Sequence, residues 1–386
     1  MKKLGTMALA LCMSAALAVP AFAAEDNGLL ISPNPISQEV TTTATEEAYA
    51  HTIIINGEKM DTSALPVSDG IPLRMLAEAD HGSASWYGEE RTGYAYLDGA
   101  SISFNADTLE LSLDGEVVEG VSVELIKGVT FVPVEVIDGL DNYTVIASEA
   151  DGVKTYSITT ANNDPMVKLA YAIAEASNCY ASFKSDLESY EMNYSLAEGT
   201  FTSGLQLTGM IVSPDCMMVA KLSENADREA VMAAMEEQKA NLESTFSWYL
   251  SQNLPKVQDA RMIIEGDYVL FLIAENADAG EQIFRDYVAN VKTVAVEVVG
   301  KDGETVTMNL DTTAENLGQA LVESGLVMGE TTEYGLYITT VNGYTADESA
   351  QEWWCITKGG ATVDTGADTT PIADGDQFEL TLKTGW

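Results

Sequence analysis

The stretch KTVAVEVVGKDGETVTMNL, residues 292–310, decides the expected fold of the C-terminal part of this chain. Apolar and polar residues alternate on both sides of a charged glycine turn, which is typical of a β-hairpin. A helical pattern follows in TTAENLGQALVESGLV, with Thr312 or Thr313 as its N-cap. Three further strand patterns come next: GLYITTVNG, EWWCITKGG and DQFELTLKT. A hairpin, a helix and then strands predict a β-grasp-like domain over residues 291–386.

Two adjacent tryptophans, Trp353 and Trp354, lie in the second of these strand patterns. Neighbouring side chains of a strand point to opposite faces, so we expect one indole in the core and the other exposed or at a groove. Cys355 shares a face with Trp353 and Ile356 shares one with Trp354, so the choice between them stays open. Aromatic faces stack on flat ligands and sugars. The candidate ligand-binding residues are Trp353, Trp354, Tyr337, Tyr344 and Lys358.

This segment resembles the transcobalamin-like C-terminal domain. The resemblance rests on Gly335 to Gly343, on the two tryptophans, and on Ile372-Ala373-Asp374-Gly375-Asp376, which occur in that family's order. It implies a module that covers a corrinoid held against a separate helical barrel. Here Lys358-Gly359-Gly360 replaces the usual Asn-Gly, and the helical barrel is absent from the sequence. We therefore predict no cofactor and no metal site, with cobalamin as the alternative.

Residues 51–160 are expected to form a domain of strands, turns and short helices, beginning with a hairpin that turns at Asn56-Gly57. The segment resembles the copper amine oxidase N-terminal-like (stalk) domain. That resemblance rests on Ile71-Pro72-Leu73-Arg74 with Ala77-Glu78-Ala79, on Trp86, and on Phe131-Val132-Pro133-Val134. It implies a non-catalytic accessory module of exported Gram-positive proteins. Copper amine oxidases need three histidine ligands, whereas this chain has only His51 and His81, which we expect in exposed loops.

Residues 161–290 predict a second α+β domain. Asp164-Pro165 is a typical N-cap and first-turn pair, a long amphipathic helix is expected from Val231 to Leu250, and a hairpin turns at Glu265-Gly266-Asp267. The methionine-rich run is interpreted as core, with a soft-metal or promiscuous apolar site as the alternative; it consists of Met210, Met217, Met218, Met232 and Met235. The segment resembles a family of uncharacterised exported domains, which implies no activity. Cys179 and Cys216 are interpreted as buried thiols, with a bridge between them as the alternative.

The N-terminus predicts export. Lys2 and Lys3 precede an apolar run from Leu4 to Val19, and small residues before the expected cleavage point indicate a signal peptide over 1–23. Residues 24–50 are expected to be a disordered linker. No later segment has the ~20 apolar residues of a spanning helix, so the mature chain is expected to be secreted, extracellular or cell-wall associated.

The formal net charge of −41 argues against nucleic acid as a partner, because the chain and a phosphate backbone repel each other. The sequence contains no HExxH, GxSxG, P-loop, GxGxxG or SxxK motif. We therefore predict a non-enzymatic, multidomain cell-surface binding protein of a Gram-positive bacterium, whose partner is a cell-wall or extracellular ligand or another surface protein. A corrinoid or other small-molecule carrier is the alternative, and a carboxylate-based hydrolase is a third reading.

Overall fold

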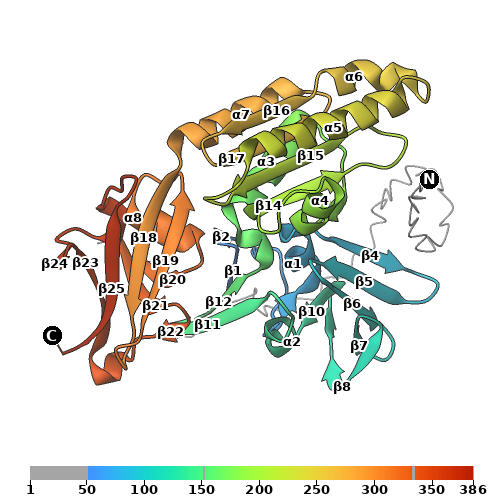
Figure 1. Ribbon diagram of the computed structural model, residues 1–386. Coiled ribbons are helices and arrows are strands. Elements are labelled where there is room, and N and C mark those ends of the chain that lie inside the picture. The colour runs from blue at the N-terminus through green and yellow to red at the C-terminus, as the bar shows by residue number, and fades with distance from the viewer. Residues whose placement is uncertain (1–50, 151–152, 333–334, 386) are drawn as a thin grey trace, which may run out of the picture. The chain divides into compact units, whose positions relative to one another are not determined.

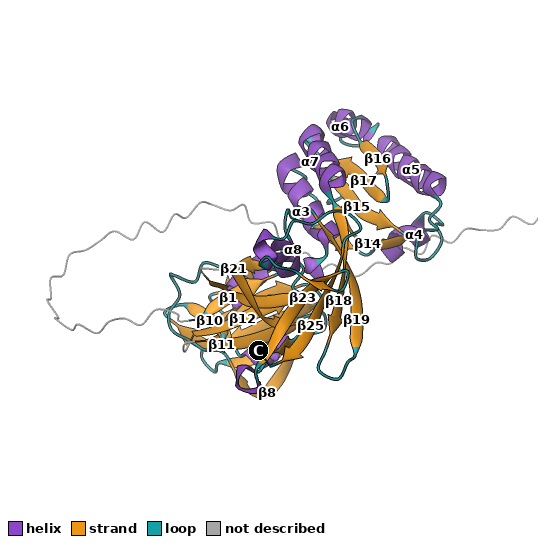
Figure 2. Ribbon diagram, turned by 90° about the vertical axis from the view of Figure 1, so that its left-hand side faces the viewer, coloured by secondary structure: helices purple, strands orange, loops and turns teal. Residues whose placement is uncertain are grey.

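The computed structural model describes residues 51–150, 153–332 and 335–385. The chain divides into two units, residues 1–46 and residues 47–386, and every element described below belongs to the second. Helices and sheets are mixed along this unit (Figures 1 and 2), which confirms the α+β, multidomain prediction. The expected signal peptide and linker lie outside the described residues. Among the helices of the described part, none combines the length and the apolar character needed to cross a membrane.

The N-terminal part contains three sheets. Its elements are β1 (Thr52–Ile55), β2 (Glu58–Lys59), β3 (Ile71–Pro72), α1 (Leu73–Ala79), β4 (Ser83–Tyr87), β5 (Thr92–Leu97), β6 (Ala100–Asn105), β7 (Glu110–Leu113), β8 (Glu116–Ser122), β9 (Glu124–Ile126), β10 (Val129–Val132), α2 (Val134–Asp138), β11 (Thr144–Ala150) and β12 (Val153–Thr159). The hairpin at Asn56-Gly57 is confirmed, since both residues have the positive φ that its tight turn requires. The longer partner of β1 is β12, which pairs with it in parallel.

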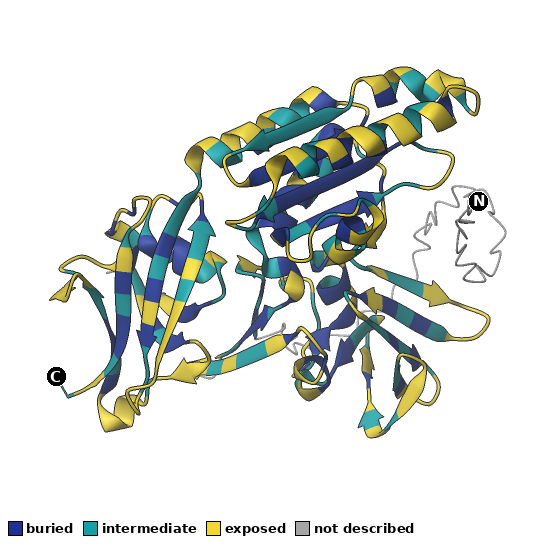
Figure 3. Ribbon diagram, in the orientation of Figure 1, coloured by how far each residue is buried: buried dark blue, intermediate teal, exposed yellow. Residues whose placement is uncertain are grey.

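Five strands of this part form an antiparallel sheet in the order β4-β5-β6-β7-β8. The alternation of β5 and β6 places Ala95, Leu97, Ile102 and Phe104 on the buried face (Figure 3). Helix α1 belongs to the same apolar cluster through Leu73, Leu76 and Ala77. The opposite face carries the polar and aromatic residues of the same strands.

The central part is one antiparallel sheet with buried residues on both faces. Its elements are η1 (Ala161–Asn163), α3 (Pro165–Ser177), β13 (Phe183–Ser185), α4 (Leu187–Asn193), β14 (Phe201–Thr208), β15 (Cys216–Leu222), α5 (Arg228–Phe246), η2 (Ser251–Asn253), α6 (Leu254–Gln258), β16 (Arg261–Glu265), β17 (Tyr268–Ile273) and α7 (Ala277–Asn290). The strand order is β13-β14-β15-β17-β16. Met217 and Val219 belong to the cluster that includes α3 and α7, whereas Met218 and Ala220 belong to the cluster that includes α5.

The predicted start of α3 is confirmed, because the Asp164 side chain accepts a hydrogen bond from the Met166 backbone N–H at 2.7 Å and Pro165 opens the helix. The core interpretation holds for Met217, Met218 and Met235, which are buried. It is wrong for Met210, which is 61% exposed in the loop between β14 and β15.

The C-terminal part consists of a five-stranded sheet, a three-stranded sheet and one α-helix. Its elements are β18 (Lys292–Val299), β19 (Thr305–Thr312), α8 (Leu317–Glu323), β20 (Val327–Thr332), β21 (Gly335–Val341), β22 (Tyr344–Thr345), η3 (Glu348–Ala350), β23 (Glu352–Lys358), β24 (Ala361–Thr362), η4 (Ala367–Thr369) and β25 (Gln377–Thr384). The larger sheet has the order β19-β18-β25-β23-β24, and its β18 and β25 pair in parallel. The hairpin and the three strand predictions are confirmed, while the β-grasp-like assignment stays a prediction.

The predicted cap of α8 is wrong. Asn316 caps this helix, because its side-chain oxygen accepts a hydrogen bond from the Gln319 backbone N–H at 2.9 Å. Thr312 is the last residue of β19, and its hydroxyl accepts from the backbone N–H of Ala314 at 3.0 Å. The strand therefore runs further along the chain than the sequence pattern indicates, and the helix starts later.

Candidate functional site

The two adjacent tryptophans of β23 occupy different environments. Trp354 is 7% exposed and belongs to the C-terminal apolar core. Trp353 is half-buried, and its indole Nε1–H donates a hydrogen bond to the carbonyl oxygen of Gly385 at 2.9 Å. Trp353 is thus the more exposed of the pair, which answers the question that strand alternation left open. Its polar atom already has a partner within the domain.

Tyr344 is the one predicted residue that contacts a predicted neighbour. Its ring meets the Trp354 ring edge-on, with 6.3 Å between the ring centroids. The Tyr344 hydroxyl donates to Glu352 Oε2 at 3.0 Å, and Lys301 Nζ lies 2.6 Å from Glu352 Oε1. Lys301 holds the pKa of Glu352 below its ordinary value by pairing with the carboxylate. Partners within the domain therefore satisfy the Glu352 carboxylate, whereas the buried indole Nε1 of Trp354 has no hydrogen-bond partner among the described residues.

The two remaining candidates lie apart in the fold. Lys358 Nζ is 2.7 Å from Asp376 Oδ2 and 5.0 Å from the centroid of the Phe378 ring. Tyr337 is 39% exposed and lies on β21, in the smaller sheet. The structure therefore brings together only Tyr344 and Trp354 of the five candidates. Their ligand-binding role stays a prediction.

A more exposed aromatic surface lies on the N-terminal sheet. Tyr87 of β4 and Tyr94 and Tyr96 of β5 share its outer side, and we call these three residues the tyrosine face. Tyr87 is 51% exposed and Tyr96 is 48% exposed. The rings of Tyr94 and Tyr96 are nearly parallel, while Tyr87 meets Tyr94 edge-on with 5.3 Å between the centroids. Side chains of this kind offer a large apolar area with a polar hydroxyl at the tip.

Serines flank the tyrosines of β5 on both neighbouring strands. Tyr94 pairs with Ser85 on β4 and with Ser103 on β6. Tyr96 has the same arrangement, with Ser83 and Ser101 as its partners. Because serine is short, it leaves the neighbouring ring raised above the sheet, and its hydroxyl both donates and accepts hydrogen bonds. The alternation of TGYAYL and SISFN carried this signal, but the sequence did not show which side of the strands faces out.

The inner side of the same sheet borders an apolar groove of about 540 Å³. Trp86, which is 49% exposed, and Phe104 form its aromatic wall, and their ring centroids lie 6.3 Å apart. Arg74 contributes the main polar group, and its Nη1 donates to Glu78 Oε1 at 3.2 Å and to the Ala84 carbonyl at 3.3 Å. With its guanidinium paired, the groove offers mainly apolar contact. In the sequence, Trp86 was notable only as one of the residues shared with the stalk-domain family.

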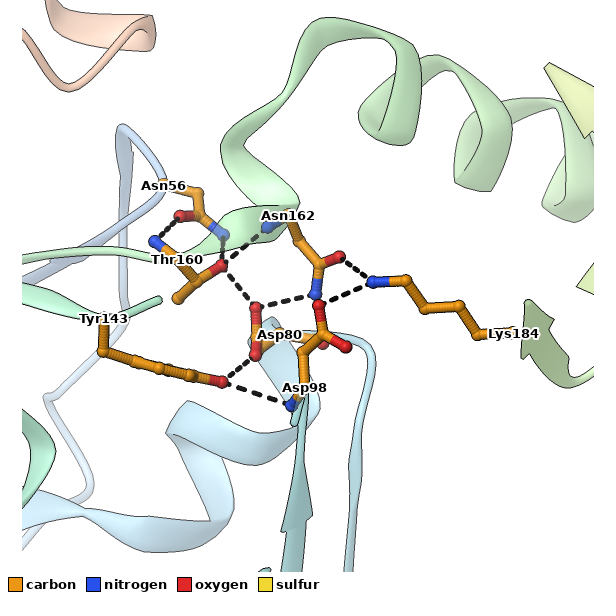
Figure 4. A network of polar contacts seen from close by, with 7 residues as sticks. All are labelled: Asn56, Asp80, Asp98, Tyr143, Thr160, Asn162 and Lys184. Atoms are coloured by element: carbon orange, nitrogen blue, oxygen red, sulfur yellow. Dashed lines mark hydrogen bonds and ion pairs between the residues drawn. The ribbon is translucent and has the colours of Figure 1, made fainter. Parts of the chain in front are cut away.

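A buried carboxylate lies at the centre of the polar network shown in Figure 4. Asp80 is 2% exposed and accepts hydrogen bonds from the Tyr143 hydroxyl, from Thr160 Oγ1 at 2.6 Å and from Asn162 Nδ2 at 2.9 Å. Burial raises the pKa of Tyr143, which keeps this phenol protonated as a donor. Lys184 joins the network by donating to Asn162 Oδ1 at 3.1 Å. A carboxylate with three protein donors is held in place by them, which favours a structural role over a catalytic one.

The described residues contain no group of three or more His, Cys, Asp or Glu side chains that could hold a metal ion. The expectation of an exposed loop is wrong for His51, whose side chain is 11% exposed and whose Nε2 lies 2.9 Å from Asp69 Oδ1. His81 is exposed, but its ring stacks on Tyr171 with 3.5 Å between centroids. Partial burial of the imidazole lowers the pKa of His81.

Three family models match separate segments of the chain. The copper amine oxidase N-terminal domain matches residues 51–155. A domain of unknown function, DUF4358, matches residues 184–274, and another, DUF4430, matches residues 314–384. The stalk-domain recognition is thereby confirmed, and the central segment corresponds to an uncharacterised domain as predicted. Among curated proteins, none matches this chain.

Two solved structures are similar to parts of the chain. A protein of Ruminococcus gnavus, described as a "putative metal binding protein", is 54% identical over 25% of this chain and 99% of its own, with a TM-score of 0.24. Through that segment, this chain belongs to the same family as that protein. Haptocorrin in complex with Cbi is 17% identical, covers 42% of this chain and 41% of its own, and has a TM-score of 0.22. The chain thus spans less than half the length of haptocorrin.

Proposed function

We propose that this chain is a non-enzymatic, exported binding protein of a Gram-positive cell surface, and that the tyrosine face binds an uncharged polysaccharide. The observation that carries the proposal is the arrangement of Tyr94 and Tyr96, two parallel rings on an outer sheet face with a serine on each neighbouring strand. The match to the copper amine oxidase N-terminal domain supports the non-catalytic part, since that module resembles an accessory stalk.

The chemistry of the face fits a sugar better than a fully apolar ligand. The axial C–H groups of a pyranose ring present an apolar side that packs on an aromatic ring, while the equatorial hydroxyls need donors and acceptors around it. Ser85, Ser103 and the tyrosine hydroxyls supply such groups. Two adjacent rings along one strand provide successive contacts, as a polymer requires.

The net charge of the chain further restricts the class of ligand. A chain with a net charge of −41 repels an anionic polymer such as a polyphosphate-containing wall chain. That repulsion is screened beyond roughly 10 Å at 0.1 M salt, so it acts mainly near the surface. An uncharged glycan avoids this cost, which is why we favour it over an acidic one.

The ligands named in the descriptions of the two similar proteins do not change this proposal. The Ruminococcus gnavus protein is described as a putative metal binding protein, and the described residues of this chain contain no group of three or more His, Cys, Asp or Glu side chains that could hold an ion. A corrinoid is less favoured, because Trp354 is in the core and Trp353, Tyr344 and Lys358 already have partners.

Affinity electrophoresis of the purified chain through gels containing neutral or acidic polysaccharides tests the proposal. We expect retardation by at least one neutral β-linked glucan, mannan or chitin-type polymer, and none by polyanionic chains. Free migration through every gel would overturn the proposal. Equal retardation by the Tyr94→Ser/Tyr96→Ser variant would remove the tyrosine face from it.

A further inference from the structure

A second cavity lies in the central part of the chain, away from the tyrosine face. It has a volume of about 330 Å³ and is bordered by helix α5 and by the loop that connects β14 to β15. Small-molecule sites have volumes of roughly 300–1,000 Å³, so this one suits a compact ligand or a single side chain with its neighbouring backbone. The segment matches a domain of unknown function, so no ligand is assigned to it.

A buried amide without a full set of partners lines this cavity. Gln238 of α5 is 8% exposed, and its Oε1 has no hydrogen-bond partner among the described residues. Its Nε2 lies 3.9 Å from Cys216 Sγ, and a thiol is a weak acceptor. A buried polar group without a hydrogen-bond partner destabilises the folded state, so the fold keeps Gln238 here at a cost in stability. A ligand that pairs with the amide would recover that cost.

The loop side of the cavity's mouth is apolar, whereas Asn241 and Thr245 are exposed polar residues of α5 that also line the cavity. Met210 and Ile211 of the loop line it and are 61% and 85% exposed, and Val212 beside them is 52% exposed. Three consecutive exposed apolar residues are unusual on a surface that carries so much charge, and exposed apolar patches commonly mark interaction sites. Leu242 of α5 lines the cavity as well, so a ligand meets apolar atoms from both the helix and the loop.

We propose that this cavity binds an uncharged peptide segment, with one aliphatic side chain between Ile211 and Leu242 and a backbone amide against Gln238. A side-chain amide carries a donor edge and an acceptor edge, so a peptide amide is its complementary partner. Acidic peptides are disfavoured by the net charge of the chain. This site is separate from the tyrosine face, and the proposal does not depend on glycan binding.

The test titrates the full chain, carrying ¹³C-methyl methionine, with N-acetyl-leucinamide while the Met210 signal is followed by NMR. The signal is assigned through Met210→Leu. We expect a saturable shift with N-acetyl-leucinamide. We expect none at the same concentrations with N-acetyl-glycinamide, which lacks the side chain, or with N-acetyl-leucine, which carries a carboxylate. Absence of a saturable shift with the leucinamide overturns the proposal.

Two variants separate the contributions of the Gln238 amide and the Ile211 side chain to binding. Gln238→Leu removes the amide but keeps the size of the side chain, and we expect roughly 10-fold weaker binding, which corresponds to the loss of one hydrogen bond. Gln282→Leu, on an exposed face of α7, is the matched control and should bind as the unaltered chain does. Ile211→Ser should weaken binding about 5-fold, and this residue is too exposed for the change to affect folding. If Gln238→Leu does not fold, Ile211→Ser alone tests whether the cavity binds the leucinamide. Unchanged affinity in Gln238→Leu and Ile211→Ser would contradict the site.

Discussion

The rings of Tyr94 and Tyr96 lie at an angle of 11° to each other, with 6.5 Å between their centroids. Residues two apart on a strand share a face, and the serines on both neighbouring strands leave these rings without bulky neighbours in register. The two rings therefore lie nearly parallel on one open face of the sheet, where one ligand can contact both of them.

Replacing these tyrosines one at a time should weaken retention by a neutral polysaccharide. We expect Tyr94→Ser and Tyr96→Ser each to reduce the affinity about 5- to 10-fold, because each removes one stacking surface worth roughly 1 kcal/mol. Affinity electrophoresis gives the dissociation constant from the dependence of mobility on polymer concentration. Tyr180→Ser is the control, because it makes the same chemical change at a different place. Tyr180 lies in the central part of the chain and is 74% exposed. An equal loss in the control would mean that the effect is nonspecific.

Asp80 should be a major stabilising residue of the N-terminal part. Asp80→Ala leaves Tyr143, Thr160 and Asn162 without their shared acceptor, and we expect the free energy of unfolding to fall by about 3 kcal/mol. Urea unfolding followed by circular dichroism measures this change. Asp107→Ala removes an exposed carboxylate paired with Arg91, and a surface pair of this kind contributes at most about 1 kcal/mol. Similar losses in the two variants would show that the Asp80 network is weak.

Elements with strong periodicity were predictable from the sequence alone. Helix α3 has a capping residue and a proline in their expected places, and the strand patterns of β21, β23 and β25 alternate clearly. Partners far apart in the sequence were not predictable in the same way. β1 pairs with β12 across about a hundred residues, and no local pattern encodes that register. The cap of α8 was missed because two threonines and an asparagine all suit the position, and only the end of β19 decides among them.

The candidate site was predicted less well than the fold. Trp353 and Trp354 drew attention because tryptophan is rare, but rarity does not separate a core residue from an exposed one. The tyrosine face depends on which side of β5 is covered, and that follows from how α1 and the neighbouring strands pack. The Asp80 network joins residues from position 56 to position 184, so no spacing rule connects them.

Cys179 should react slowly with alkylating reagents at neutral pH. Burial raises the pKa of this thiol to about 11, and the thiolate is the reactive form. In the folded chain we expect the alkylation rate by iodoacetamide to rise about 10-fold per pH unit between pH 8 and pH 10, because the thiolate fraction rises that steeply below the pKa. In urea the pKa returns to roughly 8.5, so at pH 8 the unfolded chain should react on the order of 100-fold faster.

Mass spectrometry of the Cys179 peptide measures both alkylation rates. In the structure, Cys179, Cys216 and Cys355 are free thiols. A plateau in the folded-state rate already at pH 8 would contradict the raised pKa. Failure of Cys179 and Cys216 to react after unfolding without a reductant would indicate the bridge between them that the sequence left open.

The two tryptophans of β23 should differ sharply when each is replaced by alanine. Trp354→Ala empties a buried position, so we expect a loss of about 3–5 kcal/mol in the free energy of unfolding. Trp353→Ala removes a half-buried ring and one hydrogen bond to Gly385, and its loss should be about 1–2 kcal/mol. Urea unfolding of each variant measures the difference.

A cobalamin titration of the chain followed by absorbance tests the corrinoid alternative, and we expect no spectral change at high micromolar ligand. A saturable change that Trp353→Ala abolishes, in a variant that remains folded, would instead favour the corrinoid alternative.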